Sequence, residues 1–265
     1  MAAQNIERFH YGQGEVLAAR WDGDTPPAEN DWVNLWDVGA LSLALTRNSF
    51  THQESRSGKK MEVREIPNGE TGQVNATINA INTYNLALLM SGAPVDTVSG
   101  SVSAHELPAN VAAGDIILLP HIGVSSVVIT DSAGTPAVVP AENFSVAGGY
   151  GKIAVKSLPT GPAPTSPLKV AYSYAAQRAV GILSEANPAK IALRYNGINL
   201  AENGAPVVVD LWKLSVGVLS ELALINNDTS VANMPFTAKL LADLTRDEDD
   251  ELGFFGQLRY LQTNA

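Results

Sequence analysis

The segment Val38-Gly-Ala-Leu-Ser-Leu-Ala-Leu-Thr-Arg-Asn-Ser-Phe50 decides how the rest of the chain is interpreted. Apolar side chains alternate in it with small or polar ones, so that Leu41, Leu43 and Leu45 share one face of an extended chain. An alternation with a period of two residues is typical of a half-buried β-strand. We therefore expect a long strand here, with one face packed and the other in water.

A turn and a returning strand are expected directly after this segment. Residues Glu54–Lys60 contain Gly58, which adopts positive φ without a steric penalty. The chain then continues as Met61-Glu-Val-Arg-Glu-Ile66, in which apolar and charged residues are interleaved. The pattern predicts a long β-hairpin with a charged tip, of the kind that reaches onto a neighbouring subunit.

A third strand is expected from Thr71 to Ile81, where the alternation resumes. Its apolar face comprises Val74, Ala76, Ile78 and Ala80. Its polar face comprises Gln73, Asn75, Thr77 and Asn79. Strands with two such faces suit a sheet that packs on one side and meets water on the other.

The periodicity then changes to about 3.6 residues, which predicts a short helix over Tyr84–Ser91. Asn82 or Thr83 is placed to cap its first turn, and Gly92 to end it. Almost all of the remaining chain is predicted to be strand, so the expected fold class is mostly β. A β-sandwich or barrel with a long hairpin and one short packed helix fits this pattern.

The composition narrows the class of protein. The chain has 265 residues, 17% charged residues, no cysteine and a formal net charge of −10. It is therefore globular, without disulfides or thiolate chemistry, and unsuited to wrapping nucleic acid with a basic face. No basic segment followed by an apolar run stands at Met1–Arg8, and no apolar run reaches the length of a membrane span, so neither a signal peptide nor a span is predicted.

The domain organisation follows from a shift in composition. The segment 93–175 holds 9 of the 15 prolines but only 8 of the 44 charged residues. Short apolar runs punctuated by Gly and Pro predict an inserted β-sandwich-like module over 94–175. The core domain then comprises 1–93 and 176–265. The alternative is that the strands of 94–175 extend the main sheet.

Three features are expected in the C-terminal part. Gln177–Asn187 is interpreted as holding a helical turn, and Asn196-Gly197 as the turn of a hairpin. An acidic run, Asp247–Glu251, precedes a last strand over Phe254–Leu261.

The sequence contains no convincing catalytic, cofactor or metal motif. The four histidines show no paired spacing, and no thiolate is present, so a metal site is not predicted. Ser57-Gly-Lys-Lys60 matches Ser-x-x-Lys but lies at a hairpin tip without companion motifs. We expect no enzyme and no cofactor, and the absence of a site favours a structural role.

Several of these segments resemble the major tail tube protein of long-tailed, non-contractile bacteriophages. The resemblance lies in Gly14–Ala18, Val38–Leu45, the turn from Glu54, the polar strand from Thr71 and the helix end Asn85–Gly92. The segments Val207–Lys213 and Leu222–Asp228 are similar too. It covers roughly residues 10–92 and 177–265 and leaves 94–175 outside.

The resemblance implies a structural virion protein, made in the host cytoplasm and located in the phage tail. Such subunits form hexameric rings that stack into a tube, with tape-measure and tail tip or terminator proteins as partners. Genomic DNA passes through the channel without tight binding. The polar face Gln73, Asn75, Thr77 and Asn79 is then a candidate channel lining, and Arg56, Lys59 and Lys60 are candidate contacts to acidic groups of an adjacent subunit.

A rival interpretation is a carbohydrate- or protein-binding β-sandwich module of the adhesin type. It would use the loops of the inserted module, with Tyr150, Tyr172 and Tyr174 as contacts. The same tyrosines are equally well explained as core residues. A monomer that binds glycan would distinguish this interpretation from one that forms rings.

Overall fold

The structure is a computed structural model that describes residues 9–227, 231–247 and 251–261. It confirms a mostly-β fold with several antiparallel sheets and a single short α-helix. The chain divides into two compact units, 1–93 with 180–265 and 94–179. Each unit has its own hydrophobic core and is described by itself.

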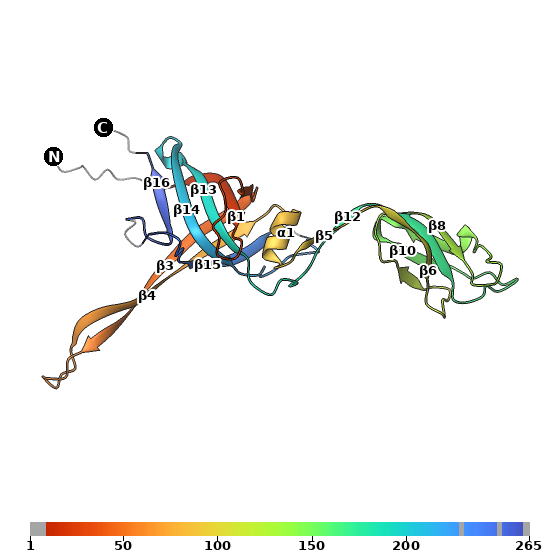
Figure 1. The fold of residues 1–265 in the computed structure, drawn as a ribbon, viewed down its shortest axis with the longest axis horizontal. Helices are drawn as coiled ribbons and strands as arrows, with labels where there is room; N and C mark the ends of the chain where they lie inside the picture. Colours follow the sequence, from red (N-terminus) through yellow and green to blue (C-terminus); the bar gives the residue numbers. More distant parts are fainter. Residues whose placement is uncertain (1–8, 228–230, 248–250, 262–265) are drawn as a thin grey trace. The chain divides into compact units, whose positions relative to one another are not determined.

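One eight-stranded antiparallel sheet forms the first unit (Figure 1). The strand order is β2-β1-β13-β14-β15-β4-β3, and β16 pairs with β14 beside this path. Their bounds are β1 Gly12–Arg20, β2 Val33–Asn34, β3 Val38–Gln53, β4 Glu62–Ile78, β13 Lys190–Asn199, β14 Ala205–Val216, β15 Met234–Leu241 and β16 Gly256–Tyr260.

The sheet divides at β14. Residues Val207–Leu211 of β14 pair with β16, whereas Lys213–Val216 pair with β15 on the same edge. The first half of β14 therefore leads to the short strand β16, and the second half leads to β15, β4 and β3. This division separates two branches of the sheet.

The hairpin β3–β4 is longer than the sequence suggested. Met61–Ile66 and the strand from Thr71 were expected as separate strands, but β4 runs without interruption from Glu62 to Ile78. Asn48 pairs with Gly69 and Ser49 with Pro67, so that Asn68 is the extra residue of a β-bulge. A bulge allows a Pro-Asn-Gly sequence, which usually marks a turn, to remain inside a strand.

Two expectations for the C-terminal part are wrong. Asn196-Gly197 is not a turn, because β13 continues through it, and the hairpin turns at Asn203-Gly204, where both residues have positive φ. Gly197 is instead needed for space, since a Cβ there would lie 2.3 Å from the Tyr195 ring. Gln177–Asn187, expected to hold a helical turn, contains none, and its residues Gln177–Val180 form strand β12 paired with β5 (Pro94–Thr97).

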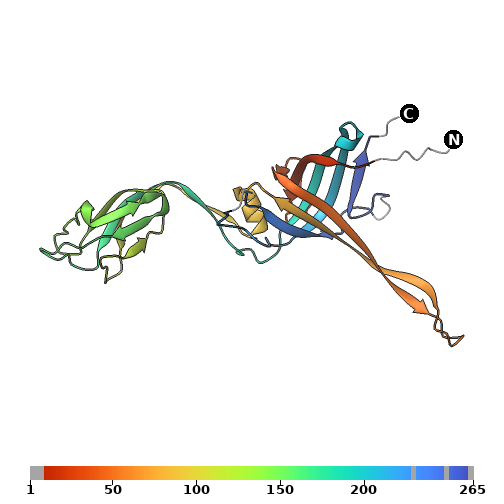
Figure 2. The same ribbon diagram turned by 180° about the vertical axis from the view of Figure 1, so that it is seen from behind.

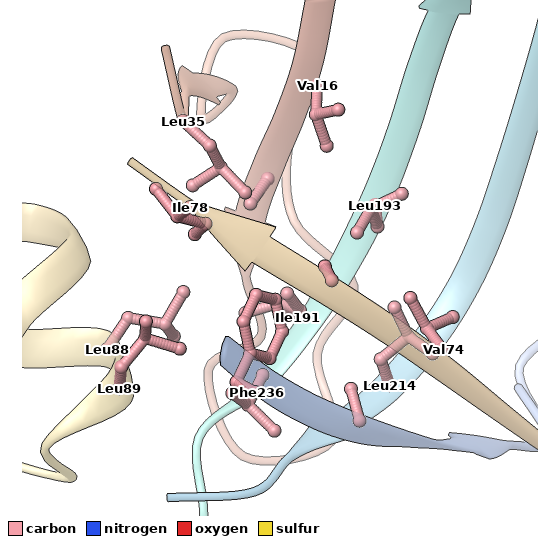
Figure 3. Close-up of a cluster of buried hydrophobic side chains, with 14 of the residues drawn as sticks. Val16, Leu35, Val74, Ile78, Leu88, Leu89, Ile191, Leu193, Leu214 and Phe236 are labelled. Carbon is pink, nitrogen blue, oxygen red and sulfur yellow. The ribbon is translucent and has the colours of Figure 1, made fainter. Parts of the chain in front are cut away.

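Helix α1 (Thr83–Leu89) covers part of the inner face of the sheet. Asn82 caps it as expected, because its side chain accepts a hydrogen bond from the Asn85 backbone N–H. Leu88 and Leu89 pack with Ile78, Ile191 and Phe236 in the core (Figure 3). The buried Asn85 amide donates to the Leu35 and Ala80 carbonyls at 3.1 and 2.9 Å, which fastens the helix to the chain on both sides.

The second unit is a small two-sheet sandwich. One sheet has the order β7-β10-β9 and the other β6-β11-β8, and a core that includes Ile153 and Val170 lies between them. The bounds are β6 Gly100–Glu106, β7 Ile116–Leu118, β8 Val124–Thr130, β9 Phe144–Ala147, β10 Lys152–Val155 and β11 Lys169–Tyr174. Short 3₁₀ turns, η1 Ala141–Asn143 and η2 Gly148–Tyr150, flank β9, and η3 (Leu200–Glu202) lies in the first unit.

Asp131 organises the loops at one end of the sandwich. Its buried carboxylate accepts backbone hydrogen bonds from Ala137 at 2.7 Å, Thr165 at 3.2 Å and Ala133 at 3.4 Å. These N–H groups hold the pKa of the carboxyl below its usual value of 3.8. The ionised form therefore joins the proline-rich loop around Thr165 to the turn after β8.

We predict that Asp131→Asn destabilises the second unit at neutral pH and much less near pH 3. A carboxyl whose folded-state pKa is depressed stabilises the fold above its unfolded pKa, and this contribution is lost as the pH falls through the folded value. Urea unfolding at both pH values measures the difference from wild type. Glu142→Gln, an exposed change in the same unit, is the control. An equal loss for Asp131→Asn at both pH values would contradict the prediction.

Candidate self-association surface

The inner face of the first unit's sheet is only partly covered. Near α1 the core is closed, but toward β3 and β16 the apolar side chains line an open groove of about 680 Å³. Its walls and floor include Leu41, Leu43, Leu45, Leu211, Leu240 and Leu258, from four different strands. Of these, Leu45 is 69% exposed and Leu258 is 61% exposed. Leucines on the inner side of a sheet are normally buried, so the core is incomplete here.

The strand that borders this groove also has an open edge. β3 is the last strand of the sheet and, among the described residues, has no strand partner except β4 along its 16 residues. Backbone N–H and C=O groups on an open edge are a template for pairing with another chain. An apolar groove next to a long open edge is therefore a candidate surface for association.

A buried carboxylate holds the opposite wall of the groove in place. Asp210 of β14 accepts hydrogen bonds from Gln257 at 2.9 Å and Arg259 at 2.5 Å, both on β16. Arg194 of β13 approaches the same carboxylate at 3.7 Å. The interactions fasten β16 to the sheet, with Leu258 between the two tethered residues.

Beyond the sheet, β3 and β4 continue as a two-stranded arm (Figures 1 and 2). The arm comprises Arg47–Gln53 and Glu62–Glu70, and neither strand has another partner there. Phe50 lies directly opposite Ile66 and is 51% exposed. An isolated two-stranded ribbon with an exposed aromatic residue gains little from its own contacts, so a binding surface is its simplest role.

The predicted tip residues Arg56, Lys59 and Lys60 are exposed and lie in the turn of the arm. Glu54 shapes this turn by accepting hydrogen bonds from the Arg56 and Ser57 N–H groups at 3.1 and 3.2 Å. Lys60 has positive φ, which directs the chain into β4. No ion pair of the three cationic side chains occurs within the described part of the chain.

The predicted polar face is present on β4. Gln73, Asn75 and Thr77 alternate with the buried residues Val74, Ala76 and Ile78. Their cross-strand partners extend the same face over β3 and β15: Ala44 and Lys239 flank Gln73, Ser42 and Thr237 flank Asn75, and Ala40 and Pro235 flank Thr77. The three strand segments 38–46, 71–78 and 234–241 contain no Asp or Glu and a single charged residue, Lys239.

Asn79 is placed differently from the other three candidates. It follows the last residue of β4, and its side chain donates to the Asp37 carboxylate at 3.2 Å. Its backbone N–H also donates to the Asp37 carbonyl at 2.8 Å. The structure thus groups Gln73, Asn75 and Thr77, whereas Asn79 fixes the chain before the helix.

The tyrosines of the second unit do not form a common binding surface. Tyr172 is buried, and this burial raises the pKa of its hydroxyl. The hydroxyl lies 2.9 Å from Nδ1 of His121. Tyr174 packs against the core and stacks on His121 with the ring centroids 3.7 Å apart. Only Tyr150 is open to solvent. The interpretation of Tyr172 as a ligand contact is therefore wrong, because its ring belongs to the core.

Reasoning from the sequence missed the groove. It placed Leu41, Leu43 and Leu45 on one face correctly, but the period of two residues gave no reason to expect that Leu43 and Leu45 stay uncovered. Phe255 and Leu258 were predicted to lie in the last strand, but not to line a groove. Burial along a strand depends on its distant neighbours, so no local signal could have identified these residues as lining.

The described residues contain no group of three or more His, Asp or Glu side chains that could hold a metal ion. Nor does any of their helices have the length and apolar character required to cross a membrane. What the arrangement offers chemically is non-covalent: an open strand edge, an apolar groove, a projecting arm with a cationic tip, and a nearly uncharged polar face.

Comparison with known proteins gives a family without a described activity. The chain belongs to the family described as "Protein of unknown function UCP028589", whose model matches residues 9–259. Among curated proteins, no sequence matches the chain.

We predict that Asp210→Ala loosens β16. The variant leaves Arg194, Gln257 and Arg259 without their shared acceptor, and loss of hydrogen bonds to a charged group costs about 2 kcal/mol of unfolding free energy. Urea unfolding measures the loss, and hydrogen exchange should show faster exchange for the amides of residues 256–260 than for those of β13. Glu221→Ala, at an exposed position, is the control. Unchanged exchange in β16 would contradict the tethering role.

Proposed function

We propose that this protein is a structural subunit that completes its fold by joining copies of itself, and that the product is a phage tail tube of stacked hexameric rings. The observation that carries the proposal is the open side of the sheet. The edge of β3 and the groove beside it are both unsatisfied in a single chain. A closed ring removes such edges, because each copy supplies a partner to the next.

The exposure of the groove supports an interface rather than a small-molecule pocket. The groove is lined by residues of β1, β3, β4, β13, β14, β15 and β16, and its lining also includes polar side chains such as His10 and Tyr195. Leu45 and Leu258 in its walls are 69% and 61% exposed. A ligand site normally encloses most of the surface of its ligand, which walls as exposed as these do not.

The polar face of β3, β4 and β15 is the candidate channel wall. These strands contain no carboxylate, and Lys239 is their one charged residue. A wall of amide, hydroxyl and methyl groups offers passing nucleic acid few fixed charges, so phosphates find no strong binding position. We therefore propose that DNA passes an almost neutral wall, with Gln73, Asn75 and Thr77 facing it.

The proposed partners follow from the resemblance of the sequence to tail tube proteins. They are further copies of the chain, a tape-measure protein inside the growing tube, and tip or terminator proteins at its ends. The location is then the virion, after synthesis in the host cytoplasm. The arm β3–β4 supports this assignment, because a projecting ribbon suits contact between successive rings.

We predict that the purified full-length protein forms rings or tubes. Size-exclusion chromatography and negative-stain electron microscopy at increasing concentration test this directly. The expected result is a species much larger than the 27.9 kDa chain, with a central channel. A stable monomer at all concentrations, especially one that binds glycan, would contradict the proposal and favour the adhesin-like alternative.

We also predict that Asn75 faces the channel of the assembled tube. The chain has no cysteine, so Asn75→Cys introduces a single reactive thiol. In the assembled state it should react with a small maleimide but not with a maleimide on a large polyethylene glycol chain, whereas the dissociated protein should react with both. Thr135→Cys, exposed in the second unit, should react with both reagents in both states. Equal reactivity of Asn75→Cys toward the large reagent before and after assembly would place this face outside the tube.

A further inference from the structure

Two apolar surfaces of the first unit remain uncovered by any described residue. One is the groove between β3 and β16, whose lining includes Leu45, Phe255 and Leu258. The other is the cross-strand pair Phe50–Ile66 on the arm. Exposed apolar patches of this kind usually mark sites of protein association.

The arm of a chain cannot fill the groove of the same chain. Phe50 follows the groove residue Leu45 by five positions in the uninterrupted strand β3, a separation of about 17 Å at the usual rise per residue. β4 is equally continuous on the other side of the arm. The arm leads away from the sheet, as Figures 1 and 2 show, so any arm in the groove comes from a second copy.

The charges on the two surfaces are complementary. Between His52 and Arg64 the arm has four cationic side chains and two carboxylates, whereas the rest of the chain has 13 and 25. The carbonyl of Phe254, which precedes the groove residue Phe255, accepts a hydrogen bond from the Asp243 N–H at 2.9 Å. Asp247 and Glu251 are exposed and stand eight and four positions before Phe255 in the sequence. Carboxylates that complement a cationic tip are therefore close in sequence to a groove residue.

We propose that the arm of one copy docks in the groove of a second copy, with Phe50 and Ile66 against the groove leucines and Lys59 and Lys60 near Asp247 and Glu251. This assigns the occupant of the groove and rests on the self-association proposed above. The apolar contact supplies most of the affinity, because it removes large side chains from water. The charges select the orientation and speed the encounter, and their effect decreases with salt.

Disulfide trapping tests the apolar contact. Single-cysteine proteins with Phe50→Cys are mixed with proteins carrying Leu43→Cys, Leu45→Cys or Leu258→Cys, and the mixtures are oxidised under assembling conditions. Because the chain has no cysteine of its own, a cross-linked heterodimer of the two variants reports one defined pair. At least one mixture should give this heterodimer in at least tenfold higher yield than the same mixture with Thr51→Cys, which lies opposite Glu65 on the other face of the arm. Yields equal to the Thr51→Cys control in all three mixtures would overturn the docking.

Charge exchange tests the polar contact. Lys59→Glu with Lys60→Glu should weaken association at least tenfold in low salt, measured by sedimentation velocity. A partner carrying Asp247→Lys and Glu251→Lys should restore it when the two proteins are mixed. Lys152→Glu with Lys156→Glu makes the same charge change in the second unit and should leave association unchanged. Equal weakening by both double variants, or no rescue by the partner, would overturn the assigned orientation.

The two experiments separate this inference from the proposed function. A protein that stays monomeric under every condition overturns both. A protein that forms tubes without cross-links to the groove, and without the charge rescue, overturns only the docking of the arm.

Discussion

The first unit depends on one unmet requirement: strand β3 has a partner on one side only. Its 16 residues form the border of the sheet, and the side chains beneath it are not fully covered. Edge strands of stable monomers are usually short, charged or hidden by another element. β3 has none of these protections between Val38 and Thr46, where every residue is apolar, small or a hydroxyl. Such an edge offers a template for pairing with another chain, which is the basis of the proposed self-association.

The contrast with the second unit makes the argument specific. There the two sheets face each other, and residues from both, such as Ile153 and Val170, are fully buried in a shared core. That sandwich satisfies its own inner faces, and Asp131 secures its loops from within. The inner faces of the second unit are therefore covered within that unit, whereas the inner face of the first unit's sheet is not.

Local patterns predicted which segments form strands, and long-range packing decided the rest. The alternation at Leu41, Leu43 and Leu45 correctly predicted a strand, and Asn82, one of the two residues expected to cap the helix, is the one that does. The prediction of a turn at Asn196-Gly197 was wrong, because Gly197 provides space beside the Tyr195 ring. The dipeptide alone does not reveal this role. The sequence did not predict that Met61–Ile66 and Thr71–Ile78 belong to one strand. A β-bulge opposite Asn48 accommodates the turn-like sequence between them. The polar face was predicted from the spacing of Gln73, Asn75 and Thr77, whereas the groove required knowledge of the division at β14.

The distribution of charge links the open edge to the proposed channel. Although the chain has a net charge of −10, segments 38–46, 71–78 and 234–241 contain no carboxylate, and their one charge is Lys239. In a strongly acidic protein, a solvent-exposed face of three strands without Asp or Glu is not the average outcome of its composition. If copies join through β3, these faces become continuous around the ring. Were the faces acidic, they would repel one another across the narrow channel, whatever the number of copies. In the proposed ring, a nearly neutral face avoids this repulsion. The same face offers a polyanion few fixed charges, as the proposed channel requires.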